Sequence, residues 1–101
     1  MRGEVYRLPA RGKGHEQRGP RFAVVLQPEW LTLSTWIVAF TSTKARETTF
    51  RPRVTIAGTE TLVMCDQLAT VDVTRLSQPA GNLTLEEMQR VDEALLLVLD
   101  L

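Results

Sequence analysis

Residues that could act on a phosphodiester occur in three short stretches, each next to a segment expected to form a strand. The first is residues 15–21, the second is Thr41-Ser42, and the third is Cys65-Asp66-Gln67. A guanidinium suits a phosphate and the charge that develops on it, a hydroxyl adds a hydrogen bond, and a carboxylate can take a proton. If the three stretches meet at one rim of a small barrel, they form a groove for a phosphodiester. Spacing alone leaves open whether they meet.

Each of these candidates also has a purely structural interpretation. Arg21 could lie along the surface, Thr41 could satisfy a backbone amide at a strand end, and Asp66 could bond its own backbone in a turn. A lone loop histidine such as His15 is usually only solvated. Cys65 belongs to a residue type that is most often a small buried apolar group.

The pattern of apolar residues predicts a run of short strands before residue 76. The expected strands are residues 3–8, 22–26, 36–40, 53–56, 61–64 and 68–71, with a turn at Ala57-Gly58. Residues 9–20, rich in Gly and Pro, and the polar residues 44–51 are expected to be loops. Five or six short strands of this kind indicate a small barrel or a strongly bent sheet.

The end of the chain predicts a helix over Leu85–Leu99. Thr84 and Glu87 form the Thr-x-x-Glu pattern of a capping box. Apolar residues then recur every three or four positions, which gives one apolar face for packing on the sheet; they are Met88, Val91, Leu95 and Val98, with Leu99 beside them.

The two tryptophans differ in their expected surroundings. Trp36 lies within a buried type of strand and is expected in the core. Trp30 follows Pro28 in a loop and is the better candidate for stacking on a nucleic-acid base.

Length and composition favour one globular domain, residues 1–101. The chain has 44% hydrophobic and 24% charged residues, which is typical of a folded protein. A single cysteine and a single histidine argue against a disulfide framework and a zinc site, so we expect no cofactor. The longest apolar stretch, Ala94–Leu99, is far shorter than the ~20 residues of a membrane span. With no apolar signal-peptide core at the start, we expect a soluble, cytoplasmic protein.

The formal net charge is zero, but the charges are unevenly distributed. Residues 1–53 carry ten basic and four acidic side chains, whereas residues 54–101 carry two basic and eight acidic ones. This division suggests a basic surface for a polyanion, unless folding pairs the two halves and no basic patch survives.

Four stretches of the sequence resemble motifs of the MazF/PemK/Kid family of toxin endoribonucleases. Residues 2–6 (RGEVY) resemble the family's opening R-G-[DE]-[VI]-[YW], and residues 14–21 (GHEQRGPR) resemble its loop G-[SH]-E-Q-x-G-x-R. Residues 38–42 (VAFTS) resemble a strand end V-x-x-[TS]-[SA], and residues 65–72 (CDQLATVD) resemble x-[DE]-Q-x-R-T-[IV]-D. The resemblance covers nearly the whole chain.

The resemblance implies a mainly β fold, a small SH3-like barrel with a C-terminal helix, that acts as a homodimer. It further implies metal-independent cleavage of single-stranded RNA, which leaves a 2′,3′-cyclic phosphate and a 5′-hydroxyl and inhibits translation, and neutralisation by a cognate antitoxin. By position, Arg21 matches the family's catalytic arginine and Thr41 its catalytic threonine or serine. Asp66 matches a carboxylate proposed as the base in some members, and His15 matches a loop histidine that only some members have, so both are catalytic candidates. The positions expected to contact RNA are Glu16, Gln17, Arg18, Ser42, Lys44, Gln67 and Thr70.

The sequence departs from the family pattern at three positions. Phe22 stands where proline often follows the loop arginine. Met64 and Ala69 stand where some members carry arginines, so an acid role given to the first of these cannot be transferred here. That leaves Arg21 or His15 to protonate the leaving group and suggests a different cleavage motif.

Two other functions remain open from the sequence. A gyrase poison of the CcdB type would share the barrel, since fold alone does not fix function. A non-catalytic RNA-binding barrel would use the basic loop only for phosphate contacts and would leave RNA uncut.

Overall fold

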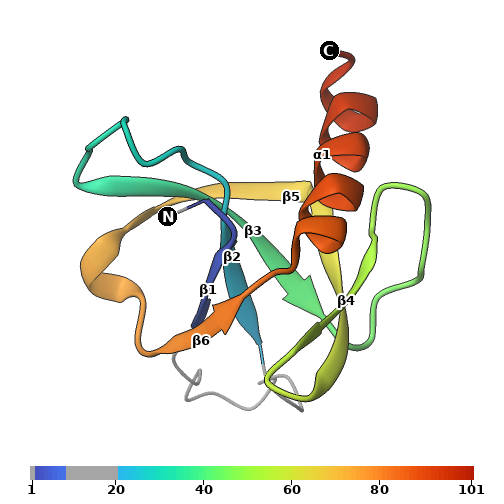
Figure 1. Cartoon of the computed structure of the whole chain (residues 1–101), viewed down its shortest axis with the longest axis horizontal. Helices are drawn as coiled ribbons and strands as arrows, with labels where there is room; N and C mark the ends of the chain where they lie inside the picture. The colour runs from blue at the N-terminus through green and yellow to red at the C-terminus, as the bar shows by residue number, and fades with distance from the viewer. Residues whose placement is uncertain (1, 9–20) are drawn as a thin grey trace.

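The computed structural model describes residues 2–8 and 21–101, which form one curved antiparallel sheet and one long helix (Figure 1). The strands are β1 (Glu4–Arg7), β2 (Phe22–Val25), β3 (Thr35–Ser42), β4 (Arg53–Ile56), β5 (Thr59–Asp72) and β6 (Pro79–Asn82). A short 3₁₀ turn, Val73–Arg75, follows β5, and the helix α1 spans Leu85–Leu99.

The sheet curls into a nearly closed barrel. Its strand order is β4-β5-β3-β2-β1-β6, with every neighbouring pair antiparallel. The two end strands, β4 and β6, come into contact, which brings the edges of the sheet together (Figure 1). The prediction of a mainly β fold with a small barrel and a C-terminal helix is confirmed.

One expected gap between strands is absent. Two strands were expected at residues 61–64 and 68–71, but β5 runs through both without a break. The pairing with β3 instead becomes irregular. Ala39 pairs with Leu68 and Thr41 pairs with Val63, so a step of two residues along β3 corresponds to a step of five residues along β5. The extra residues on β5 form a bulge, and bulges bend a strand and redirect side chains. Asp66 lies in this bulge, so the polar residues that suggested a break mark a bend.

The strand β6 was not expected, because its Pro79-Ala80-Gly81-Asn82 sequence resembles a turn. It lies at the end of the strand order, where proline is tolerated because only one side of the strand needs ladder bonds. Gly81 adopts a φ of +114°, which favours glycine. The predicted turn at Ala57-Gly58 is confirmed, with φ angles of 50° and 80° between β4 and β5.

Alternating side chains of the strands pack into two apolar clusters. The inner cluster lies between the sheet and α1, where fully buried residues such as Phe22 and Val24 pack with Val91 and Ala94 of the helix. The outer cluster, on the other face, is centred on Ala23, Val25 and Val38. It also includes the half-buried side chains Tyr6, Trp36 and Phe40.

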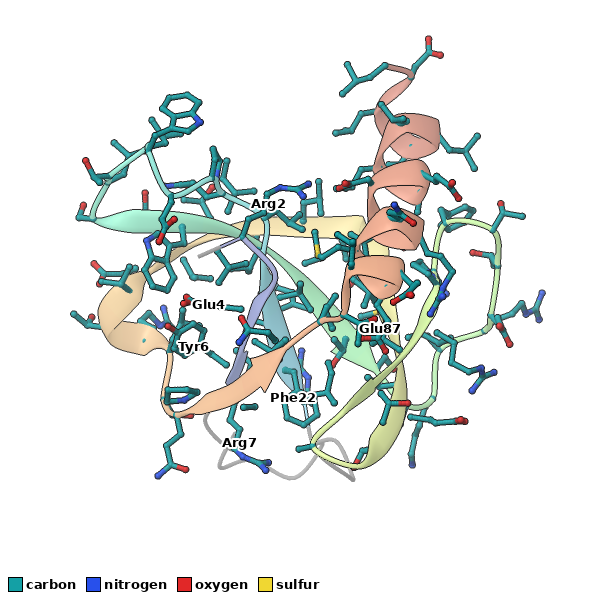
Figure 2. All side chains as sticks on the ribbon, in the orientation of Figure 1. Arg2, Glu4, Tyr6, Arg7, Phe22 and Glu87 are labelled. Atoms are coloured by element: carbon teal, nitrogen blue, oxygen red, sulfur yellow. The ribbon has the colours of Figure 1, made fainter. Side chains whose placement is uncertain are left out.

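The predicted helix boundaries and capping box are confirmed. Thr84 Oγ1 accepts from the Glu87 N–H at 3.1 Å, and Glu87 Oε1 accepts from the Thr84 N–H at 2.9 Å. Glu87 also accepts from the N–H of Thr55 through Oε2 at 2.9 Å, which ties the start of α1 to β4 (Figure 2). On the apolar face Val91 is buried, whereas Leu99 is 48% exposed.

Candidate functional site

Arg21 lies directly before β2, on the side of the sheet that carries the outer cluster. Its carbonyl accepts from the N–H of Leu8 at 3.1 Å, which fixes the backbone beside β1. Its guanidinium carbon lies 6.0 Å from the centre of the Phe40 ring. The Nε atom is buried and has no hydrogen-bond partner within residues 2–8 and 21–101. The head of Arg21 therefore lies against the aromatic face of Phe40.

Thr41 is fully buried near the end of β3. Its Oγ1 accepts a hydrogen bond of 3.0 Å from the backbone N–H of Phe22, the residue after Arg21. This is the structural role considered for a strand-end threonine. Thr41 therefore fixes the backbone that carries Arg21. The catalytic role of Thr41 stays a prediction.

Ser42 and Lys44 lie where β3 passes into the next loop. Ser42 Oγ accepts from the N–H groups of Lys44 and Ala45 at 3.1 and 3.0 Å. The serine thereby orders the first turn of the loop, and the Lys44 side chain is exposed. Both remain predictions as RNA contacts.

Asp66 is held by Arg51, the last residue of the polar segment 44–51 that was expected to be a loop. Arg51 donates from Nε to Oδ1 at 3.0 Å and from Nη2 to Oδ2 at 2.8 Å. The hydrogen bond from Arg51 is the main reason that the pKa of Asp66 lies below its usual value. Asp66 is therefore a carboxylate with both oxygens bonded, and a proton transfer to it would compete with this ion pair.

The register of the β4–β5 hairpin was the signal that could have identified Arg51. Backbone hydrogen bonds continue this ladder beyond Arg53, the first residue of β4, to residues 50–52. Counting back from the predicted turn at Ala57-Gly58 places Arg51 opposite Met64. Met64 lies two residues before Asp66 on β5.

The described parts of the three stretches are Arg21, Thr41-Ser42 and Cys65-Asp66-Gln67, and they lie on or next to β2, β3 and β5, which are neighbours in the sheet. The hydrogen bond between Phe22 and Thr41 joins the first two. The third stretch, Cys65-Asp66-Gln67, begins two residues after Val63, which pairs with Thr41. Gln67 and Thr70 are exposed farther along β5.

The remaining loop candidates, His15, Glu16, Gln17 and Arg18, lie outside the described residues. Trp30 is 78% exposed in the loop between β2 and β3, and its stacking role stays a prediction.

Cys65 is confirmed as a buried residue. Its side chain belongs to the inner cluster, and burial raises the pKa of its thiol to about 11, with smaller contributions from Asp66 and Asp92. A protonated, buried thiol is a poor nucleophile.

Part of the charge division is neutralised by folding. Arg2 pairs with Asp92 of α1 at 2.5 Å, and Arg51 pairs with Asp66. Both pairs join a basic residue of the first half to an acidic residue of the second, as the alternative interpretation expected.

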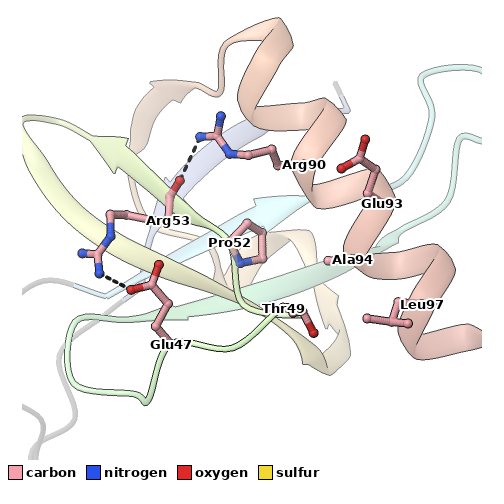
Figure 3. A pocket seen from close by; sticks show the side chains of 8 residues that line it. All are labelled: Glu47, Thr49, Pro52, Arg53, Arg90, Glu93, Ala94 and Leu97. Atoms are coloured by element: carbon pink, nitrogen blue, oxygen red, sulfur yellow. Dashed lines mark hydrogen bonds and ion pairs between the residues drawn. The ribbon is translucent and has the colours of Figure 1, made fainter.

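A separate hollow lies between α1 and the loop that precedes β4 (Figure 3). Arg90 of α1 donates to the carbonyl of Arg53 at 2.9 Å, and Arg53 pairs with Glu47 beside it. None of the described candidate residues lines this hollow. Within the described part of the chain, no three His, Cys, Asp or Glu side chains gather as a metal-ion site, and no helix is long and apolar enough to cross a membrane.

Comparison with known proteins gives agreement in sequence and in fold. A family model described as PemK-like, MazF-like toxin of type II toxin-antitoxin system matches residues 1–99. A Mycobacterium tuberculosis (strain ATCC 25618 / H37Rv) protein named "Putative toxin Rv3098A/RVBD_3098A" is 37% identical over 97 residues, covering 93% of this chain and 92% of that protein.

Solved structures share the barrel and the helix. A mycobacterial endoribonuclease in complex with its cognate antitoxin matches with a TM-score of 0.81 and 19% identity, over 100% of this chain and 95% of that one. Mycobacterium tuberculosis toxin MazF-mt6 matches with a TM-score of 0.77 and 21% identity, over 99% and 98% of the two chains. At these identities the structural matches establish the fold.

Proposed function

The chain belongs to the PemK-like, MazF-like toxins of type II toxin–antitoxin systems, and from this membership we propose that it is an endoribonuclease that cuts single-stranded RNA without a metal ion. The observation that supports this most is the placement of Arg21. Its guanidinium lies over the Phe40 ring, and the Thr41–Phe22 hydrogen bond fixes the backbone next to it. A fixed guanidinium is suited to a phosphate because its planar donors match phosphate oxygens and stay charged.

In the proposed reaction the ribose 2′-hydroxyl attacks the adjacent phosphorus and the bond to the 5′-oxygen breaks. The products are a 2′,3′-cyclic phosphate and a 5′-hydroxyl. Arg21 stabilises the negative charge that builds up on the phosphoryl oxygens. The 2′-proton passes to Asp66 or to His15. Since the guanidinium of Arg21 stays charged, the 5′-oxygen takes its proton from His15. Since the attack needs the 2′-hydroxyl, DNA is not a substrate.

The proposed partners are RNA, a second copy of the chain and a cognate antitoxin. A structural neighbour was solved in complex with its cognate antitoxin, which supports an antitoxin here. Cleavage of messenger RNA by the free toxin would stop translation and growth.

End-mapping of a long single-stranded RNA tests the proposal. The purified protein is incubated with the RNA in excess EDTA beside the Arg21→Ala variant. We expect discrete cuts with 5′-hydroxyl ends, and a cleavage rate lower by about 10²–10³ in Arg21→Ala, as when one preorganised charge-stabilising group is removed. Arg90→Ala is the matched control, because it removes an exposed arginine from α1, away from β2 and β3.

Near-full activity of Arg21→Ala would refute the role of Arg21. Intact RNA with folded wild-type protein would refute the nuclease and leave the two alternatives. A gyrase supercoiling assay would then test the poison, and RNA retention without cut ends would indicate the binding module.

A further inference from the structure

The guanidinium of Arg51 is fixed by three hydrogen bonds. Two go to the carboxylate of Asp66, and Nη1 donates to the carbonyl of Arg46 at 3.2 Å. The side chains of Arg51 and Asp66 are 19% and 27% exposed, so the pair is partly shielded from water. The guanidinium also lies 5.6 Å from the centre of the Phe50 ring. Three of its five N–H donors are used by described residues, which leaves two for a ligand.

Arg51 lies beside β5, on the continuation of the β4–β5 ladder. The N–H groups of Val63 and Cys65 donate to the carbonyls on either side of Arg51, at 2.9 and 3.2 Å. Arg51 is therefore directly opposite Met64. Residues directly opposite in an antiparallel pair share a face of the sheet, so the Arg51 side chain lies on the Met64 face.

The same face continues across β5 to β3. Leu62 is two residues before Met64 and shares its face, because side chains alternate along a strand. Leu62 pairs with Ser42 at the end of β3. Ser42 and Arg51 therefore lie on one face of the sheet, on opposite sides of β5.

Arg21 lies on this face as well. Its guanidinium lies over Phe40, which is two residues before Ser42 and shares its face. The face thus carries two guanidinium groups, Arg21 on the β2 side and Arg51 on the β4 side, with the hydroxyl-bearing end of β3 and the bulged β5 between them. A strand of nucleic acid laid across β3 and β5 would meet both.

We propose, resting on the nuclease function above, that Arg51 binds a phosphate of the RNA strand and that Asp66 positions Arg51 for it. A guanidinium held by a carboxylate on one edge presents its other donors in a fixed orientation, which suits the planar geometry of phosphate recognition. Asp66 is less suited to be the base, because it would have to give up a two-point ion pair to receive a proton.

RNA binding and cleavage by matched variants separate these roles. The wild type is first used to map a cut, and an oligonucleotide spanning it is made with a single 2′-deoxy residue at the cut nucleotide, so that it binds without reacting. Its dissociation constant is measured against salt concentration for the wild type and for Arg51→Ala, Arg51→Lys, Asp66→Asn and the Arg51→Ala/Asp66→Asn double variant. Arg90→Ala is again the control for loss of one exposed arginine.

We expect Arg51→Ala to weaken binding by about 10–100-fold, the loss of one charge-assisted contact. The log–log salt slope should fall by about 0.7, one phosphate of a single strand. Arg51→Lys, which keeps the charge without the planar fork, should keep the slope and lose part of the affinity. Asp66→Asn should weaken binding too, and the double variant should bind no worse than Arg51→Ala, because both changes affect one contact.

Other outcomes overturn the inference. If Arg51→Ala binds like Arg90→Ala, with an unchanged melting temperature, Arg51 does not contact the RNA although the nuclease stands. If Asp66→Asn binds as the wild type does but no longer cleaves the unmodified RNA, Asp66 is the base. If the wild type neither cuts the long RNA nor retains single-stranded RNA, the proposed function fails and the inference with it.

Discussion

The hydroxyl oxygen of Thr41 lies 3.0 Å from the backbone nitrogen of Phe22 and accepts its N–H, joining the end of β3 to the start of β2. Both residues are fully buried. A side-chain oxygen thus satisfies a buried amide next to Arg21. The position of the candidate phosphate-binding arginine therefore depends on a threonine that is itself out of contact with solvent.

Replacement of Thr41 by valine tests this dependence. Thr41→Val keeps the shape but leaves the buried Phe22 N–H without an acceptor, which should lower the free energy of unfolding by about 1–3 kcal/mol. Urea denaturation measures the change. Thr61→Val is the matched control, because the Thr61 hydroxyl is buried without a partner in the described part of the chain, so its loss should be neutral or stabilising. Equal effects of the two substitutions would contradict the role given to the Thr41 hydrogen bond.

Much of the fold could be predicted because its signals are local. The pattern of apolar residues identified β1 to β4, and Thr84 with Glu87 marked the start of α1. The strand β6 was missed because a Pro-Ala-Gly-Asn sequence is typical of a turn, and only its pairing with β1 makes it a strand. The break assigned before residue 68 was wrong because polar residues at a bulge resemble the end of a strand.

The candidate site was less accessible from sequence because it depends on register. The spacing between Arg21 and Thr41 contains no information on whether β2 and β3 pair so that the two meet. Arg51 was overlooked because it follows no motif, and its partner Asp66 is fifteen positions away on another segment. Only the ladder extending from the Ala57-Gly58 turn connects them.

The buried thiol of Cys65 should make stability depend on alkaline pH. The pKa of Cys65 is raised to about 11 in the folded protein, whereas a thiol in an unfolded chain has a pKa of about 8.5. The pKa of the thiol is higher in the folded protein than in the unfolded chain. The contribution of the buried thiol to the free energy of unfolding is therefore complete below pH 8.5 and is lost as the pH rises toward 11. Between pH 8 and pH 10 the free energy of unfolding of the wild type should fall by about 1–2 kcal/mol more than that of Cys65→Ala, as measured by urea denaturation.

The comparison with Cys65→Ala cancels other groups that titrate in this range, such as Tyr6, whose pKa is also raised, mainly by burial. A thiol reagent at pH 8 gives a second readout, since it should label the native wild type far more slowly than the urea-unfolded chain. Parallel stability profiles of the two proteins, or rapid labelling of the native state, would show that the thiol is accessible and ionises normally.

Glu87 should matter more for stability than a half-buried acid on the first turn of α1 usually does. Its carboxylate accepts from the N–H of Thr84, which completes the capping box, and from the N–H of Thr55 on β4, each at 2.9 Å. Thr84→Ala removes only the reciprocal cap bond and should cost about 1 kcal/mol. Glu87→Ala removes both carboxylate bonds and should cost more, about 1–2 kcal/mol, because the helix also loses its link to the barrel.

Glu86→Ala is the control for this pair of substitutions. Glu86 is an exposed acid in the same first turn, so its removal reproduces the loss of negative charge near the helix N-terminus without breaking either bond of Glu87. In thermal and urea unfolding, the loss of stability should therefore be largest for Glu87→Ala, smaller for Thr84→Ala and smallest for Glu86→Ala. If Glu87→Ala and Glu86→Ala cost the same, Glu87 acts only through its charge, and the attachment of α1 to the barrel rests on the buried contacts of Val91 and Ala94.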